Sequence, residues 1–360
     1  MSNSNFFYLS CYNSIMDSNK KKALIVRLSS LGDVIFNLPL ANILKANGYE
    51  VTWITSEKGI DVIKNNPAVD EAILVPLKKW KKQGFIDNFK EYIKMIKFIR
   101  SKKFDLSIDT QGLFKSFIWN SFSGAKIRMA SISGREFSYI GANTIIEPLS
   151  TDYKTHAIKN YLKFAKKLNL NTDNIEASLP DATTEIRKKI DDLLLEIDKT
   201  KPIIGIAPAT TWEPKHWNIE NWKKLVETLE KDFTLVFTGT SNDIELINSI
   251  SNNKHLNIAG KTSVLELAEF FRRCNLVISL DSGSTHLAWA SKNPKIVSIF
   301  CCTPTGLYAP IGDKDKYIAL SGNLACQPCH KRHCPLKENK NQCTLVPTVE
   351  DVYKAIKSLV

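Results

Sequence analysis

Cys274-Asn275-Leu276-Val277-Ile278-Ser279-Leu280 is an apolar run that leads directly into Asp281-Ser282-Gly283-Ser284-Thr285-His286. The run has the length of a buried parallel strand, and a helical pattern begins immediately after it. At such a junction the first backbone N–H groups of the helix have no internal partner, so an anion is a natural ligand. Asp281 would lie at the carboxyl end of the strand, where open α/β sheets hold their ligands. Capping of the helix by Asp281 or Ser282 is the alternative explanation.

Strand and helix patterns alternate on both sides of this stretch, which predicts parallel sheets. Predicted strands in the first half cover residues 22–28, 50–55, 71–75, 104–109 and 125–129, with helices over 34–46, 85–100, 113–122 and 156–168. Predicted strands in the second half cover residues 203–207, 233–238, 255–258, 275–280 and 295–300, with helices over 183–197, 219–229, 242–250, 264–272 and 284–290. The fold class is therefore α/β, with two doubly wound Rossmann-like domains that face each other across a cleft.

The chain of 360 residues is long enough for two such domains. We expect a disordered leader over 1–20, or a true start at Met16, and an N-terminal domain over 21–170. A C-terminal domain over 171–347 follows, and a helix over 348–360 could return to pack on the first domain. Residues 169–180 are rich in Asn, Thr and Asp, which is typical of a linker.

The formal net charge of +12 indicates an acidic partner, such as anionic lipid or a phosphorylated sugar, although solubility alone could explain it. Nucleic acid is disfavoured, because the chain shows no aromatic-basic stacking pattern and no recognisable binding module. No apolar run reaches the roughly 18 residues of a membrane span, and the N-terminus lacks a signal-peptide pattern. We therefore expect a cytoplasmic protein with reduced cysteines.

Polar residues follow four predicted strands of the second half. They are Ala209-Thr210-Thr211 with Lys215-His216-Trp217, then Thr238-Gly239-Thr240-Ser241-Asn242-Asp243, then Gly260-Lys261-Thr262, and finally residues 281–286. The carboxyl ends of parallel strands share one edge, so these loops predict a nucleotide-diphosphate pocket. Each loop taken alone could serve only for turns and caps.

Two charged residues of these loops have chemistry that suits a sugar nucleotide. Lys215 could neutralise a departing diphosphate, although it could also be an ordinary surface lysine. Asp243 could accept both hydroxyl hydrogen bonds of a ribose, or could merely place a negative charge at a helix N-terminus.

In the first half, Asp33 follows a turn of small residues after the first strand and could remove a proton from an acceptor hydroxyl. Helix capping is again the alternative. Basic residues are the candidates for binding an anionic acceptor, namely Lys78, Lys81, Lys115 and Arg135, and a solvated surface is the other explanation.

The C-terminal part carries Cys326-x2-Cys329-x4-Cys334-x8-Cys343, with His330 and His333 between the cysteines. Four cysteines so close together could bind a structural metal such as zinc, but the spacing matches none of the common zinc patterns. We leave the metal question open and assign this segment, which we call the cysteine segment, no catalytic role.

Three stretches resemble glycosyltransferase family 9, the ADP-heptose:lipopolysaccharide heptosyltransferases. They are Val26-Arg27-Leu28-Ser29-Ser30-Leu31-Gly32-Asp33-Val34, Asp109-Thr110-Gln111-Gly112-Leu113-Phe114-Lys115-Ser116 and Asp281-Ser282-Gly283-Ser284-Thr285-His286-Leu287. Lys215-His216-Trp217 is a fourth, and the similarity runs from Lys22 to the terminal helix. The stretches look most like heptosyltransferase I, which adds the first heptose to the Kdo region of the inner core.

The resemblance implies a GT-B fold and an inverting transfer from ADP-L-glycero-D-manno-heptose that needs no metal or other cofactor. By resemblance Asp33 is the general base, Lys215 binds the donor diphosphate and Asp243 binds the ribose. The remaining donor-site residues implied are Thr210, Thr211, Thr262, Asp281, Ser282, Gly283 and His286. Those implied for the acceptor, anionic Kdo–lipid A, are Lys78, Lys81, Lys115 and Arg135.

The resemblance also implies an enzyme that works peripherally at the cytoplasmic face of the inner membrane. Two alternatives remain open. One is a family 9 enzyme with another core acceptor or another sugar donor. The other is a sugar-nucleotide-binding protein without catalytic activity. The sequence leaves the donor base preference and the oligomeric state open as well.

Overall fold

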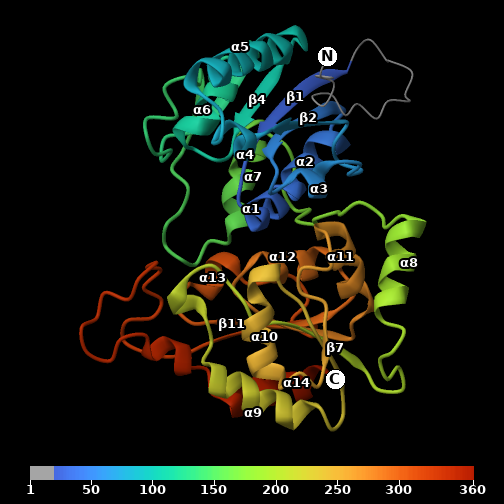
Figure 1. Ribbon diagram of the computed structural model, residues 1–360. Helices are drawn as coiled ribbons and strands as arrows, with labels where there is room; N and C mark the ends of the chain where they lie inside the picture. Colours follow the sequence, from blue (N-terminus) through green and yellow to red (C-terminus); the bar gives the residue numbers. More distant parts are fainter. Residues whose placement is uncertain (1–19) are drawn as a thin grey trace. The chain divides into compact units, whose positions relative to one another are not determined.

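The computed structural model describes residues 20–360, so the predicted leader lies outside the described residues except for Lys20 (Figure 1). The chain forms two compact units. The first ends at Thr151 and resumes over Ala157–Asp181, and the second contains Asp152–His156 and Ala182–Val360. The residues expected to form a linker, 169–180, contain no helix or strand.

The first unit is a sheet of parallel strands in the order β3-β2-β1-β4-β5-β6. The strands are β1 (Lys21–Val26), β2 (Tyr49–Ser56), β3 (Glu71–Val75), β4 (Leu106–Asp109), β5 (Ile127–Ser131) and β6 (Thr144–Ile146). The helices are α1 (Leu31–Phe36), α2 (Leu38–Ala46), α3 (Ile60–Ile63), α4 (Leu77–Trp80), α5 (Phe85–Ser101), α6 (Phe114–Ser121) and α7 (Ala157–Lys167).

The second unit is a parallel sheet in the order β12-β11-β10-β7-β8-β9. Its strands are β7 (Ile203–Ala207), β8 (Thr234–Phe237), β9 (Leu256–Asn257), β10 (Leu276–Leu280), β11 (Lys295–Phe300) and β12 (Tyr317–Ser321). Its helices are α8 (Thr184–Leu193), α9 (Ile219–Leu229), α10 (Ile244–Ser251), α11 (Val264–Arg273), α12 (Gly283–Ala290), α13 (Thr305–Tyr308) and α14 (Val349–Leu359). Three short 3-10 helices complete it: η1 (Glu213–Lys215), η2 (Ser241–Asp243) and η3 (Gln342–Leu345).

Counted from its own first strand, each sheet has the strand order 3-2-1-4-5-6 of a dinucleotide-binding fold. The order reverses between β1 and β4 in the first unit and between β7 and β10 in the second. In open α/β sheets the ligand binds outside the carboxyl ends of the strands at this reversal. The loops after these four strands therefore lie where a sheet of this kind binds its ligand.

The predicted helix over residues 34–46 is two helices, which is a correction to the sequence prediction. Asn37 ends α1 and begins α2. Pro39 has no backbone N–H to donate to the preceding turn, so an unbroken helix would lose a hydrogen bond there. Asn37 also donates from its side chain to the Asp33 carbonyl oxygen at 2.8 Å. The break sets the position of α1, which carries Asp33.

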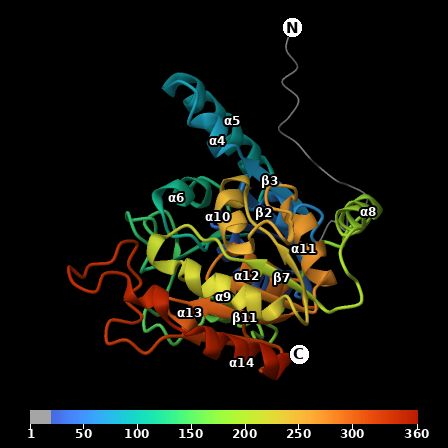
Figure 2. The same ribbon diagram turned by 60° about the horizontal axis from the view of Figure 1, so that its bottom comes forward.

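The C-terminal helix α14 packs within the second unit. Val352, Ile356 and Leu359 of α14 are buried in the core of the second unit. The chain that enters α14 is held there as well, because Trp217 Nε1 donates to the Pro347 carbonyl oxygen at 2.8 Å. Two views show α14 beside α9 (Figures 1 and 2).

Within residues 20–360, no helix combines the length and the apolar character that a membrane crossing requires.

Candidate active site

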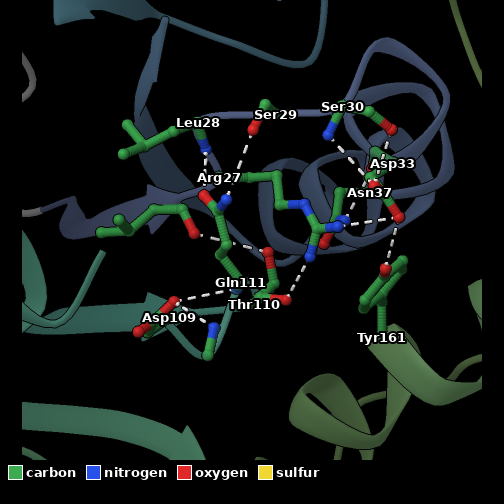
Figure 3. A network of polar contacts seen from close by, with 12 residues as sticks. Arg27, Leu28, Ser29, Ser30, Asp33, Asn37, Asp109, Thr110, Gln111 and Tyr161 are labelled. Carbon is green, nitrogen blue, oxygen red and sulfur yellow. Dashed lines mark hydrogen bonds and ion pairs between the residues drawn. The ribbon is translucent and has the colours of Figure 1, made fainter. Parts of the chain in front are cut away.

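Asp33 is the centre of a polar network at the carboxyl end of β1 (Figure 3). Its Oδ1 accepts an ion-paired contact from Arg27 Nη2 at 2.7 Å and a hydrogen bond from the Tyr161 hydroxyl at 2.9 Å. Its Oδ2 accepts from the Ser30 backbone N–H at 3.0 Å and from the Ser30 hydroxyl at 2.8 Å. The capping role is therefore real, but it occupies only one of the two carboxylate oxygens.

The surroundings keep Asp33 ionised. Burial alone would raise the pKa of Asp33, but the Arg27 guanidinium and the hydrogen bonds from Ser30 outweigh burial and lower the pKa to about 2. The Asp33 side chain is 26% exposed, whereas that of Arg27 is 8% exposed. Asp33 is thus a charged carboxylate at the reversal point of the first sheet and can be reached from solvent.

Arg27 is held in place from the neighbouring strand. Its Nη1 donates to the Thr110 carbonyl oxygen at 2.5 Å, just beyond β4. Asp109 shapes that loop, because its Oδ1 accepts from the backbone N–H groups of Gln111 and Gly112 at 2.8 and 3.0 Å. Burial raises the pKa of Asp109 to about 6, against the hydrogen bonds that lower it. The second stretch quoted above, residues 109–116, therefore supports Asp33 through Arg27.

The predicted acceptor-binding residues have different settings. Lys115 Nζ donates to the Ser29 hydroxyl at 3.2 Å, which places it beside the Asp33 turn. Burial and the nearby cations Arg27, Lys58 and Lys81 lower the pKa of Lys115, while Glu136 opposes them. Lys58, which no sequence pattern singles out, thus belongs to the same basic group.

The other two acceptor candidates lie on the surface of the first unit. Lys78 is exposed in α4, and its backbone N–H donates to Glu57 Oε1 at 2.7 Å. Arg135 is exposed in the loop after β5, and its backbone N–H donates to the Gly112 carbonyl oxygen at 2.9 Å. The side chains of both are exposed to an anionic ligand.

In the second unit, Lys215 and Asp281 form a buried ion pair at the reversal point. Lys215 Nζ lies 2.6 Å from Asp281 Oδ2, and their side chains are 14% and 4% exposed. The two residues come from the loops after the adjacent strands β7 and β10. Thr210 Oγ1 donates to the Asp281 carbonyl oxygen at 3.1 Å, and His216 Nε2 lies 3.0 Å from the Thr210 carbonyl oxygen. Three predicted donor-site residues therefore lie together.

The N-terminus of α12 lies directly beside this ion pair. Ser282 is its N-cap, but among the described residues its side chain forms no cap hydrogen bond and its buried Oγ has no partner. Gly283 follows, and His286 Nε2 lies 3.8 Å from Asp281 Oδ1. Helix N-terminal N–H groups next to an ammonium group are an arrangement that binds phosphate. The capping explanation for Ser282 is thus not realised.

The remaining predicted donor residues line the neighbouring loops. Asp243 Oδ2 accepts from the backbone N–H and the hydroxyl of Thr240, each at 2.7 Å, so Asp243 does serve the turn before α10. Thr262 is half-buried in the loop between β9 and α11, and Thr211 is exposed after Thr210. Gly260 N donates to the Gly239 carbonyl oxygen at 3.0 Å, which joins the loops after β8 and β9.

Sequence reasoning missed an aromatic and basic group beside Lys215. The Trp212 ring lies 4.7 Å from Lys215 Nζ and 5.7 Å from the Arg332 guanidinium carbon, and it stacks on the His330 ring at 5.8 Å. Burial and the charge of Lys215 lower the pKa of His330. The cysteine segment, to which no catalytic role was assigned from the sequence, therefore reaches the Lys215 site. The Trp after Thr210-Thr211 was the available signal.

Two further buried hydroxyls point to a polar ligand at the same sheet edge. Thr238 Oγ1, after β8, and Thr303 Oγ1, after β11, have no hydrogen-bond partner among the described residues. Buried polar atoms in folded proteins are almost always paired. A bound ligand would supply the missing partners.

The four cysteines of the cysteine segment line one cavity of about 380 Å³ together with Pro214 and Gln342. In residues 20–360, however, no three His, Cys, Asp or Glu side chains form a group that could hold a metal ion. Burial, chiefly, raises the pKa of Cys343 to about 11, with the neighbouring cysteines adding to it. The four cysteines therefore lie around one cavity without forming a metal-binding group among the described residues.

Comparison with known proteins decides the family. Residues 92–340 match Glycosyltransferase family 9 (heptosyltransferase), which is more than half of the chain. The chain belongs to glycosyltransferase family 9. This enzyme family has the GT-B fold, and the two doubly wound sheets confirm the fold class predicted from the sequence.

Curated relatives of this family 9 glycosyltransferase match it over most of its length. Lipopolysaccharide heptosyltransferase 1 of Campylobacter coli is 26% identical, over 94% of this chain and 98% of the relative. The protein of the same name from Pseudomonas aeruginosa is 25% identical, over 92% and 89%. Lipooligosaccharide heptosyltransferase 2 of Campylobacter jejuni is 29% identical, over 57% and 64%.

Solved structures share the fold. The family 9 glycosyl transferase from Veillonella parvula has a TM-score of 0.77 at 22% identity, over 96% of this chain and 98% of that one. The E. coli heptosyltransferase WaaC with ADP has a TM-score of 0.71 at 21% identity, over 94% and 100%. At 21–22% identity these similarities show that the chain has the GT-B fold, and they show the fold alone.

Proposed function

We propose that this family 9 enzyme transfers L-glycero-D-manno-heptose from ADP-heptose to the Kdo region of the lipopolysaccharide inner core. The observation that carries the proposal is the pair of reversal-point sites, an ionised Asp33 in one unit and Lys215 beside a helix N-terminus in the other. The names of two relatives that match over most of the chain, both lipopolysaccharide heptosyltransferase 1 at 26% and 25% identity, support heptose transfer to lipopolysaccharide. ADP-heptose as donor and the Kdo region as acceptor are what the resemblance of the motifs implies.

In the proposed reaction the first unit handles the acceptor and the second unit the donor. Asp33 accepts the proton of the attacking acceptor hydroxyl as the new bond forms at the anomeric carbon. A carboxylate has about four acceptor positions, and Arg27, Tyr161 and the two donors of Ser30 fill them. The incoming hydroxyl therefore replaces a donor that can rotate away, which is the hydroxyl of Ser30 or of Tyr161.

The donor side must stabilise the ADP that leaves. The first N–H groups of α12 and the Lys215 ammonium group supply positive charge where the diphosphate becomes more negative. The diphosphate competes with Asp281 for Lys215, so the ion pair at 2.6 Å opens or is shared when the donor binds. Thr210, Thr211 and Thr262 then line the donor, Asp243 faces the ribose, and Ser282, Gly283 and His286 face the phosphates and sugar.

The acceptor carries negative charge, and the basic group of the first unit is placed to bind it. Lys81 and Lys115 lie with Lys58 in one electrostatically coupled group, and Lys78 and Arg135 extend the positive surface. We assign the anionic Kdo–lipid A acceptor to these residues.

The test is release of ADP from ADP-heptose in the presence and absence of Kdo–lipid A. Release that requires the acceptor supports the proposal. If the enzyme binds ADP-heptose but no acceptor of this class causes it to release ADP, the acceptor assignment is wrong. If it binds other sugar nucleotides and not ADP-heptose, the donor assignment is wrong.

One observation favours a second candidate. The similarity to lipooligosaccharide heptosyltransferase 2 reaches 29% identity, higher than that to the heptosyltransferase 1 proteins, although over a shorter part of the chain. An acceptor that already carries one heptose is therefore the second candidate. Equal amounts of both acceptors in one reaction, followed by mass analysis of the products, separate the two.

A further inference from the structure

Helix α5 presents large apolar side chains to solvent. Ile86, Phe89 and Ile93 are 69%, 58% and 38% exposed. Their spacing of three and four residues places them on one side of the helix. A helix that covers a core normally turns polar residues toward water. The outer side of α5, which we call the α5 stripe, departs from that pattern.

The α5 stripe is not needed for packing, because other residues of the helix attach it to the sheet. Met95 and Ile99 are buried in the core of the first unit, and Ile96 packs against the same core. The Tyr92 ring stacks on Trp119 at 5.3 Å and contacts the Trp80 ring at 4.2 Å. Both views show α5 at the outer margin of its unit (Figures 1 and 2).

Positive charge accompanies the apolar residues. Lys90, Lys94, Lys97 and Arg100 are exposed and continue the same side of the helix, three or four residues apart. The exposed lysines Lys78, Lys79, Lys81 and Lys82 precede α5 in the chain. From residue 78 to residue 100 there are eight cationic side chains and two acidic ones, Asp87 and Glu91. This segment therefore has a strongly positive and partly apolar outer surface.

Exposed apolar residues flanked by lysines are what a helix needs to lie at a lipid–water interface. Apolar side chains enter the acyl boundary, and lysines contact anionic head groups. A protein partner would also bury Ile86 and Phe89, but it would have to carry a matching acidic surface. An anionic membrane offers both chemistries at once.

We propose that the α5 stripe docks the enzyme on an anionic lipid surface. The inference rests on the proposed function, because an enzyme that modifies a lipid-linked acceptor gains by working at the membrane that holds it. It goes further by assigning the docking to one helix face. The lysines of α4 lie on the same segment, so docking holds part of the acceptor-binding surface near the head groups.

The test is sedimentation of the full chain with vesicles of phosphatidylethanolamine and phosphatidylglycerol, compared with vesicles of phosphatidylcholine alone. We expect binding to the anionic vesicles that weakens as salt rises. The double variant Ile86→Ser, Phe89→Ser should bind at least about tenfold more weakly. The triple variant Lys90→Gln, Lys94→Gln, Lys97→Gln should lose on the order of a hundredfold at low salt.

Matched controls come from the second unit. Leu195 is 67% exposed, so Leu195→Ser removes a similar apolar side chain elsewhere. Lys314→Gln, Lys337→Gln and Lys340→Gln remove the same charge from exposed positions. Circular dichroism checks that all variants fold. If the control variants lose as much vesicle binding as the α5 variants, or if the wild type binds no anionic vesicle, the inference is overturned.

Two further outcomes keep this test separate from the test of the function. Transfer to an acceptor saccharide without acyl chains should be the same in the wild type and both α5 variants. Failure of that transfer in the wild type overturns the proposed function, whereas the vesicle result stands by itself. If the Ile86→Ser, Phe89→Ser variant instead converts a dimer to a monomer and keeps full vesicle binding, the stripe contacts a second copy and docking on lipid is wrong.

Discussion

Asp33→Asn should abolish most of the activity and also destabilise the first unit. The amide keeps the size of the side chain but can neither accept the acceptor proton nor balance the buried Arg27 charge. General-base catalysis contributes roughly 10²–10⁴-fold to a rate. We therefore expect the rate of acceptor-dependent ADP release to fall by a factor in that range, with little change in the affinity for ADP.

The effect on stability follows from the pKa. Lowering the pKa of Asp33 from its ordinary 3.8 to about 2 corresponds to about 2 kcal/mol in favour of the folded state. Because the folded pKa is the lower one, this contribution is fully present above the ordinary value and is lost as the pH falls from 3.8 toward 2. For a unit of this size we expect a fall in Tm of about 4–8 °C at pH 7.

The assay pairs ADP release with thermal unfolding between pH 4 and pH 8, and Asp70→Asn is the control. Asp70 also forms an ion pair in the first unit, with Lys45, but it lies before β3, away from the carboxyl ends of the strands. The control should lose stability and keep its activity. Activity of Asp33→Asn within tenfold of the wild type, or an equal loss in Asp70→Asn, would refute the assignment of Asp33 as base.

Three other predictions follow from the same contacts. Lys215→Met should lower kcat/KM about 10²–10³-fold, because it removes positive charge that stabilises the leaving diphosphate. It should also weaken ADP binding measured by calorimetry, and an unchanged ADP affinity would contradict the donor assignment. Tyr161→Phe should cost about 1 kcal/mol in urea unfolding, since one hydrogen bond to Asp33 is lost, and should keep the rate within tenfold; a loss as large as that of Asp33→Asn would show that the hydroxyl acts in the chemistry. Because the pKa of Asp33 is about 2, Asp33 stays ionised from pH 5 to pH 8, and kcat/KM should not fall toward pH 5 through protonation of this group. If kcat/KM does fall toward pH 5, and substitution of another titratable residue removes that fall while activity is kept, that other residue is the base.

Local sequence predicted the strands well where burial is complete. The apolar runs of β7 and β11 were placed with the bounds that the structure has, because a buried parallel strand has little reason to carry polar residues. The strands β6 and β12 were missed, since their residues are mostly only partly buried and their pattern is weak, whereas the edge strands β3 and β9 were placed at or close to their observed bounds. The packing of α14 within the second unit depends on contacts such as Trp217 with Pro347, which no local pattern contains.

The residues of the candidate site also differ in how far the sequence predicted them. Asp33, Lys215 and Asp281 were predicted because each follows a recognisable strand, and the topology brings such ends together. Tyr161 contacts Asp33 from 128 residues away, in a helix whose pattern shows only that one side is buried. His330 reaches Trp212 through a loop without regular structure. Contacts of this kind depend on where the chain returns, and a single sequence carries no signal for that.

Asp152–His156 belongs to the second unit, although the first unit surrounds it in the chain. His156 Nε2 lies 2.9 Å from the Ala309 carbonyl oxygen, and the Tyr153 ring lies 5.6 Å from that of His330. A fragment that begins at Ala182 would lack both contacts. One of them supports His330, which belongs to the cysteine segment beside Lys215. The two halves are therefore not interchangeable modules. An exchange of the second unit between relatives has to carry these five residues along, or it transfers an incomplete unit.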